Sequence, residues 1–465
     1  MPFWNMMKAG TGVLLGTVTA LAGFAHPAFA DTYEKTLANG MRVIVKEDHR
    51  APTVVHMVWY RVGAMDEVDG TSGVAHVLEH MMFKGTKNLK SGEFNKRVAA
   101  AGGRDNAFTS LDYTAYYQQV PKSKLAEMMS LESDRMHNLI VDPKEFSKEI
   151  KVVMEERRMR TDDKPQALVY ETLMSSAFQA HPYRRPIIGW MNDLEHMTAD
   201  DVRDWYKRWY VPNNAYVVVV GDVDKAEVFR LAEKYYGAIP SRALPARKPQ
   251  AEPEQVGIRR VSVKAPAKLP YIAMAYKVPE LRDVDKDRDV FALEVLAGVL
   301  DGHDAARFSK NLVRGSKIAV SAGAGYDATA RGEGTFLLDG TPAEGKTVAD
   351  LEQALRAEIE RIKKEGISAE ELARVKTQVI AAQVYKRDSM MALTMEIGGI
   401  EAVGLHWRDI DRVQEKIRSV TAEEVQTVAN KYFKDDALTV AVLDPQPLAE
   451  PDKKAAQAVS AGLRH

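Results

Sequence analysis

The sequence predicts an α+β protein of two homologous domains, each a mainly antiparallel sheet with helices packed on one face. Three observations lead to this prediction. The chain has 465 residues, which is too long for one ordinary domain. A proline-rich linker at 241–257 divides it into halves of similar length. Both halves also end in the same pattern of helix and strand.

The repeated pattern consists of a capped helix followed by a buried strand. Thr198 and Thr421 are natural N-cap residues, and acidic residues follow each of them in the expected first turn. Short, largely β-branched runs come next, at 215–220 and 437–442, and are typical of buried strands. Helix starts of this kind are common by themselves, but the matching spacing to the strand favours a duplication.

Strands and helices do not alternate regularly within the first half. Residues 41–46 and 53–62 are predicted to form two strands paired across a turn, and residues 113–120 a further strand. Residues 123–139 and 143–160 have helical periodicity. This order favours a mainly antiparallel sheet covered by helices over a series of β-α-β units.

Residues 1–30 have the order of a secretory signal peptide. A short segment with one lysine precedes an uncharged apolar stretch and the tripeptide Ala28-Phe29-Ala30. We therefore expect cleavage after Ala30 and a periplasmic protein with no stable membrane anchor. An uncleaved anchor fits less well, because the apolar stretch is shorter than the roughly 20 residues of a spanning helix. The expected parts of the mature chain are an N-terminal domain at 31–240, its homologue at 258–447 and a flexible tail at 448–465.

Composition excludes several classes of protein. The chain contains no cysteine, which rules out disulfides, thiolate metal sites and cysteine nucleophiles. The net charge is −1 and basic residues are scattered among acidic ones, so no nucleic-acid partner is expected. The apolar share of 45% and the charged share of 28% are ordinary for a globular protein.

The residues with catalytic chemistry begin in a predicted helix that Thr71 or Ser72 is placed to cap. His76 and His80 are four residues apart, so their imidazoles lie on one helical face and are close enough to share a metal ion. Glu79 flanks that face and is placed to take a proton from a zinc-bound water. A pattern of five residues also arises by chance, because two histidines on an amphipathic helix can simply pack.

A zinc site of this kind needs a third protein ligand, and the predicted helix at 143–160 offers carboxylates. Glu149 and Glu156 are seven residues apart and therefore lie two turns along one face. Glu155 lies about 100° away around the helix. The same run of charges also fits a solvated face with ion pairs between turns, so these residues alone leave both interpretations open.

Taken together, the motifs resemble the pitrilysin family, the HxxEH zinc metallopeptidases or inverzincins. The family includes insulin-degrading enzyme, the mitochondrial processing peptidases and two-domain bacterial relatives. The resemblance rests on G-x-x-H-x-x-E-H-M-x-F-K-G-T at 73–86 and on E-x-x-V-V-x-E-E at 149–156. Seventy-five residues separate His80 from Glu156, which matches the family's spacing. The resemblance covers essentially all of the mature chain.

The resemblance implies a role for each motif residue. It makes His76, His80 and Glu156 the ligands of one Zn²⁺ per chain and Glu79 the catalytic base. It implies that Glu149 orients a ligand histidine. It also implies that an extended peptide substrate adds as a strand along residues 102–109, and the implied substrate-binding residues are Asn106, Ala107, Phe108 and Thr109. A plain edge strand that begins at glycine is a compatible interpretation.

One part of the family's pattern is missing. Complete members carry an arginine and a tyrosine in the C-terminal half, in a pattern like L-R-E-K-x-G-L-A-Y, which help to stabilise the oxyanion. Here the corresponding positions fall on Val313 and Val320, whose side chains donate no hydrogen bond. A local shift would instead bring Arg314 and Tyr326 near these positions. We therefore expect a heterodimer with a homologous subunit that carries the Arg/Tyr pair.

The function predicted from the sequence is zinc-dependent endopeptidase action on short or unfolded peptides in the periplasm. A non-catalytic peptide-binding or scaffold subunit is the first alternative, and the intact zinc motif argues against it. A presequence-processing peptidase is the second alternative, and the bacterial type of signal peptide argues against that function.

Overall fold

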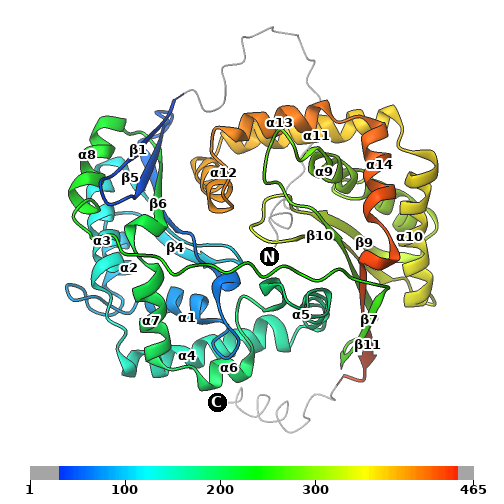
Figure 1. The fold of residues 1–465 in the computed structure, drawn as a ribbon, viewed down its shortest axis with the longest axis horizontal. Coiled ribbons are helices and arrows are strands. Elements are labelled where there is room, and N and C mark those ends of the chain that lie inside the picture. The colour runs from blue at the N-terminus through cyan, green and yellow to red at the C-terminus, as the bar shows by residue number, and fades with distance from the viewer. Residues whose placement is uncertain (1–30, 449–465) are drawn as a thin grey trace, which may run out of the picture.

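The computed structural model describes residues 31–448, so the expected signal peptide and nearly all of the expected tail lie outside it. Two sheets form the frame, one in each half of the chain, and helices surround them (Figure 1). The strands of the first sheet are β1 (Thr32–Thr36), β2 (Arg42–Glu47), β3 (Thr53–Tyr60), β4 (Arg104–Thr109), β5 (Thr114–Pro121) and β6 (Ala215–Gly221). Those of the second are β7 (Arg259–Pro266), β8 (Tyr271–Val278), β9 (Ala319–Tyr326), β10 (Gly334–Pro342) and β11 (Leu438–Gln446).

Helices follow the strands in both halves. The first half contains α1 (Val74–Met81), α2 (Glu93–Ala100), α3 (Leu125–Asn138), α4 (Pro143–Arg157), α5 (Pro165–Ala177), α6 (Met191–His196), α7 (Ala199–Trp209) and α8 (Lys225–Tyr235). The second contains α9 (Arg288–Leu300), α10 (Val348–Glu365), α11 (Ala369–Arg387), α12 (Met390–Ala402), α13 (Asp409–Ser419) and α14 (Ala422–Tyr432). Within residues 31–448, none of these helices combines the length and apolar character that crossing a bilayer requires.

The two sheets have the same topology. The first has the order β1-β2-β6-β3-β5-β4 and the second β7-β11-β8-β10-β9, so the second matches the first without β1. In each sheet one neighbouring pair is parallel, β2 with β6 and β7 with β11, and the other pairs are antiparallel. Thr198 and Thr421 form capping boxes at the starts of α7 and α14. The predicted α+β fold class is confirmed, and the matching topology supports the duplication.

The predicted pairing of the first two strands is wrong. β6 lies between β2 and β3, with Val218 opposite Ile44 on one side and Met57 on the other. All seven residues of β6 are buried, as expected for an apolar strand in the middle of a sheet. The short connection between β2 and β3 therefore crosses over β6, which begins more than 150 residues after the end of β3.

Each sheet has helices on both faces, where the sequence predicted one. Helix α12, from the second half, covers the face of the first sheet formed by β3 and β6, and α5, from the first half, packs on β7, β8 and β11 (Figure 1). Trp59 and Tyr216 of the first sheet consequently belong to the same apolar core as the second half. Each half thus covers one face of the other half's sheet with a helix, and the two halves share an apolar core.

The expected linker, 241–257, contains no helix or strand and runs between the two halves (Figure 1). Its Glu252 carboxylate accepts hydrogen bonds from the backbone N–H groups of Gln179, Ala180 and His181, at 2.8–2.9 Å. Hydrogen bonds to Glu252 therefore hold this segment against the loop at 178–181, which follows α5.

Candidate active site

Helix α1 carries the HxxEH motif, and its N-terminus is capped by the side chain of Glu67, which precedes the helix in the chain. Its N-cap is Gly73, with φ 87°, and neither Thr71 nor Ser72 caps it, so the predicted cap is wrong. The buried carboxylate of Glu67 accepts hydrogen bonds from the N–H groups of Gly73, at 2.8 Å, and Ala75, at 2.9 Å. Burial raises the pKa of Glu67 to about 8, although these two hydrogen bonds oppose the shift.

The position of Gly73 explains why no side chain could cap the helix there. A Cβ atom on Gly73 would lie 2.6 Å from the carbonyl oxygen of Ile188, and one on Gly189 would lie 2.4 Å from that of Ser72. The two glycines thus let the backbone of the segment before α6 pack directly on the start of α1. Ser72 reinforces this contact by donating to Asp193 Oδ2, at 2.6 Å.

Replacing Glu67 with alanine should destabilise the protein and loosen the zinc site. The change would leave two N–H groups at the start of α1 without their acceptor, and loss of a helix cap costs about 0.5–2 kcal/mol. We expect a lower free energy of unfolding and weaker zinc binding for Glu67→Ala, measured by denaturant unfolding and chelator competition. Val68→Ala, at the exposed neighbouring position, is the control. Equal unfolding curves for both variants would show that Glu67 does not cap α1.

Helix α4 brings the third candidate ligand to α1. It begins at Pro143 and is capped by Asp142, which accepts hydrogen bonds from Lys144 N at 2.7 Å and Glu145 N at 3.2 Å. The helix packs against α1. As the seven-residue spacing predicted, Glu149 and Glu156 both face the histidines.

The structure brings His76, His80 and Glu156 into one group. One potential ligand atom from each residue can be chosen so that all three lie within 4.8 Å of one another. His80 Nε2 lies 3.3 Å from Glu156 Oε2, and His76 Nε2 lies 3.8 Å from Glu156 Oε1. Both imidazoles therefore turn the same ring nitrogen toward the same carboxylate.

Glu149 holds one of these rings in place. Its Oε1 accepts a hydrogen bond from His80 Nδ1 at 2.9 Å, and its Oε2 lies 2.6 Å from Lys84 Nζ. A proton on Nδ1 leaves Nε2 as the free lone pair for a metal. The contact agrees with the role that the family resemblance implied for Glu149.

The donor set fits zinc. Two imidazole nitrogens and one carboxylate make the three-ligand arrangement of catalytic zinc sites, which leaves a further position open. The surroundings of the two histidines shift their pKa values in opposite directions. Burial lowers the pKa of His76 to about 4. Burial would also lower that of His80, but the hydrogen bonds to Glu149 and Glu156 outweigh it and raise the pKa to about 9. A metal ion requires the neutral form of both imidazoles.

Glu79 lies beside this group and contacts the edge of the sheet. Its Oε2 accepts a hydrogen bond of 2.6 Å from Thr109 Oγ1, at the end of β4. Burial raises the pKa of Glu79, while the bond from Thr109 opposes the shift. A raised pKa suits a group that must take up and release a proton.

Strand β4 contains the four residues predicted to bind substrate. Among the residues described, β4 is hydrogen-bonded to β5 as its sole partner strand, so it forms an edge of the sheet. Asn106 is exposed, Ala107 is buried, and Phe108 and Thr109 are half-buried. Thr109 thus connects the predicted peptide-binding edge to the predicted base, a contact that the sequence did not reveal.

The second half has no carboxylates at the helix positions that match Glu149 and Glu156. Helices α9 and α11 pack together as α1 and α4 do. Counting from the first residue of α4 and of α11, Glu149 corresponds to Val375 and Glu156 to Ala382. Val375 is buried against Gly298, where an added Cβ would lie 2.7 Å from it. An apolar contact therefore stands at the position that corresponds to Glu149.

Valines stand where the resemblance places the family's arginine and tyrosine. Val320 is 57% exposed and Val313 is partly buried. Of the two substitutes that a local shift would offer, exposed Arg314 donates to the carbonyl of Asp304, and the Tyr326 hydroxyl donates to that of Pro279 at 2.6 Å. Arg314 and Tyr326 thus both donate hydrogen bonds to nearby backbone carbonyl groups.

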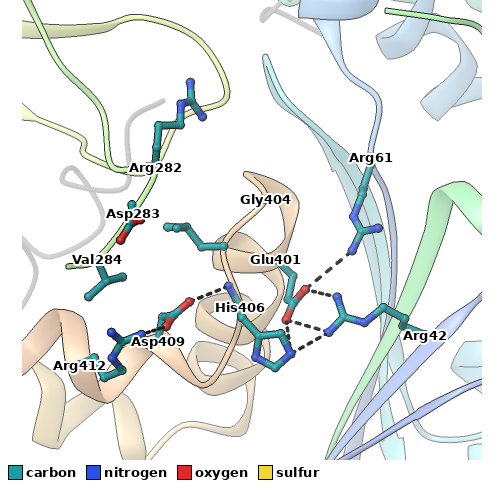
Figure 2. A pocket seen from close by; sticks show the side chains of 11 residues that line it. Arg42, Arg61, Arg282, Asp283, Val284, Glu401, Gly404, His406, Asp409 and Arg412 are labelled. Atoms are coloured by element: carbon teal, nitrogen blue, oxygen red, sulfur yellow. Dashed lines mark hydrogen bonds and ion pairs between the residues drawn. The ribbon is translucent and has the colours of Figure 1, made fainter. Parts of the chain in front are cut away.

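A cavity of about 560 Å³ between the halves is not the candidate site (Figure 2). Its walls include Arg42 and Arg61 from the first half and Glu401 from α12. Glu401 accepts from Arg42 through both oxygens and from the backbone N–H of Trp407 at 2.9 Å. The predicted site residues do not line this cavity, and Arg42 and Glu401 join the two halves across it.

Comparison with known proteins agrees with this site. Residues 42–190 match the model of insulinase, peptidase family M16, and residues 196–379 match that of the M16 inactive domain. The zinc protease PqqE of Helicobacter pylori is 33% identical over 418 residues, which cover 88% of this chain and 92% of that protein. The chain therefore belongs to the M16 peptidase family and is a zinc protease of that family.

Solved structures show the same fold. The crystal structure of a protease from Helicobacter pylori superposes with a TM-score of 0.85 at 31% identity, covering 89% of this chain and 99% of that one. The periplasmic protease PqqL from Escherichia coli has a TM-score of 0.75 at 20% identity, and the match covers 95% of this chain and 51% of PqqL. The predicted family resemblance is confirmed, and the match to the inactive domain runs from the end of α6 in the first half to α11 in the second.

Proposed function

We propose that this chain is a zinc-dependent endopeptidase that hydrolyses short or unfolded peptides in the periplasm. The observation that carries the proposal is the group formed by His76, His80 and Glu156 with Glu79 beside it. The three ligand residues would hold one Zn²⁺, which supplies a Lewis acid for the peptide carbonyl and an acidified water. The family's zinc proteases, such as PqqE of Helicobacter pylori, support this assignment.

The chain's own residues supply the remaining steps. A peptide in extended conformation adds to the open edge of β4, where main-chain hydrogen bonds hold it with little side-chain selectivity. The Glu79 carboxylate takes a proton from the attacking water and then delivers it to the leaving amine. Thr109 fixes the orientation of Glu79 by its 2.6 Å hydrogen bond.

The proposal includes a homologous partner subunit. Val313 and Val320 stand at the positions of the family's arginine and tyrosine, and Tyr326 is bound to Pro279. Loss of an oxyanion donor costs on the order of 10²–10³ in rate. A sibling chain that carries the pair would restore these donors in a shared chamber.

The periplasmic location is supported by two observations. The signal-peptide pattern at 1–30 indicates export, and the related protease PqqL of Escherichia coli is periplasmic.

The test is cleavage of a quenched, unstructured fluorogenic peptide by the purified mature chain, with and without a chelator. We expect a zinc-loaded chain that cleaves slowly or not at all by itself and gains activity with its sibling subunit. Fast, chelator-sensitive cleavage by the chain alone would contradict the need for a partner. A chain with neither bound metal nor cleavage would favour the scaffold function instead.

A further inference from the structure

Arg160 contacts the third ligand residue from the solvent side. Its Nη1 lies 2.6 Å from Glu156 Oε1, four residues earlier in the chain. Arg160 belongs to a π-helical segment, Arg158–Asp162, that continues α4 past its last α-helical residue. Irregular turns of this kind often occur at functional sites. The arginine side chain is 73% exposed, whereas that of Glu156 is mostly covered.

The contact leaves the two oxygens of Glu156 in different environments. Oε2 lies 3.3 Å from His80 Nε2, while Oε1 forms an ion pair with Arg160 and lies 3.8 Å from His76 Nε2. A carboxylate that gives one oxygen to a metal has a second oxygen that needs a donor. A guanidinium is well suited to this role, because it stays charged and its N–H groups point in fixed directions.

The arrangement matches the one on the neighbouring ligand. His80 is held by Glu149, which is in turn held by Lys84. Arg160 forms an ion pair with Glu156. Two of the three ligand residues therefore each contact a further charged side chain.

Neighbouring arginines show that the contact is specific to Arg160. Arg157 turns inward to Glu171, at 2.8 Å, and is buried. Arg158 pairs with Glu155 at 3.0 Å, and both side chains are largely exposed. Arg158 therefore offers a matched position of the same chemistry whose partner, Glu155, is not among the predicted ligands.

We propose that Arg160 is a positioning residue that holds Glu156 in the orientation required for metal binding. The inference rests on the proposed function, because it concerns the same zinc site. Outer partners of metal ligands commonly contribute about 10–100-fold to metal affinity. Competition between Arg160 and the ion for Glu156 Oε1 would have the opposite effect, which is tighter zinc binding once the arginine is removed.

The experiment measures zinc affinity of the full mature chain by competition with a chromogenic chelator. We expect Arg160→Gln to bind zinc about 10–100-fold more weakly than wild type, and Arg160→Lys to recover part of the loss. Arg158→Gln should bind as wild type does. Thermal unfolding of the metal-free proteins should be equal, and the visible spectrum of the Co²⁺-loaded Arg160→Gln variant should differ from that of wild type.

Equal or tighter zinc binding by Arg160→Gln would overturn the inference, as would an equal loss in Arg158→Gln. Because the readout is metal affinity, it does not depend on peptide cleavage. Weaker binding by Arg160→Gln in a chain that binds zinc but cleaves nothing would support the positioning role while contradicting the peptidase. A wild-type chain that binds no zinc would overturn both.

Discussion

Glu79→Gln should keep its zinc and lose peptide cleavage by about 10²–10⁴-fold, the usual contribution of a general base. Glutamine has nearly the same shape, and its amide oxygen can still accept the hydrogen bond from Thr109. It cannot take up a proton from water. The substitution therefore separates proton transfer from metal binding and from packing at the end of β4. Turnover of the fluorogenic peptide in the assembled enzyme and zinc content should be measured together.

Glu155→Gln provides the matched control for this experiment. Glu155 precedes the ligand Glu156 on α4, but it pairs with Arg158 and is 58% exposed. The control variant should have wild-type turnover and zinc content. A Glu79→Gln enzyme that remains active would contradict the role of Glu79 as the base. Loss of zinc from the same variant would instead assign Glu79 to the support of the metal site.

Gly398→Ala should destabilise the whole chain, because Gly398 is where α12 touches the first sheet. A Cβ atom at this position would lie 2.1 Å from Cε2 of Trp59, a fully buried side chain. Trp59 cannot easily retreat, since its ring stacks on Tyr216 with 6.0 Å between centroids. Tyr216 in turn donates to the carbonyl of Gly398 at 2.7 Å. Overpacking of this kind typically costs about 1–3 kcal/mol.

The next residue of the helix supplies a control of opposite sign. Gly399 lies in the same turn of α12, but no described atom lies within 4 Å of a Cβ placed on it. Alanine is favoured over glycine inside helices by about 1 kcal/mol, so Gly399→Ala should stabilise the protein or leave it unchanged. Denaturant unfolding compares the two variants directly. If Gly398→Ala stabilises the protein as Gly399→Ala does, the close contact between Gly398 and Trp59 does not destabilise the alanine variant.

Local chemistry explains which features the sequence could reveal. The caps at Thr198 and Thr421 depend on contacts within one turn, and both formed as predicted. The pairing of His76 with His80 follows from helical periodicity alone. Glu156 needed more, because nothing in its own helix distinguishes a ligand from a solvated carboxylate. The family resemblance identified it, and the structure then placed it beside the histidines.

Other features had no local signal, because they depend on residues that are distant in the chain. Strand β6 inserts between β2 and β3 because it is the most apolar strand and belongs in the middle of the sheet. The exchange of α5 and α12 follows from the need to cover an apolar sheet face, and the sequence does not specify which helix will do so.

By itself, the sequence determined the α+β class, the duplication and the zinc-binding motif, since each depends on periodicity or spacing along the chain. The tertiary structure alone decided how that motif is supported. Glu67 caps α1, Thr109 contacts Glu79 and Lys84 reaches Glu149 only because the fold brings separate segments together. These contacts bury or order charged groups, and their energies depend on solvent exclusion that arises only when the chain is packed.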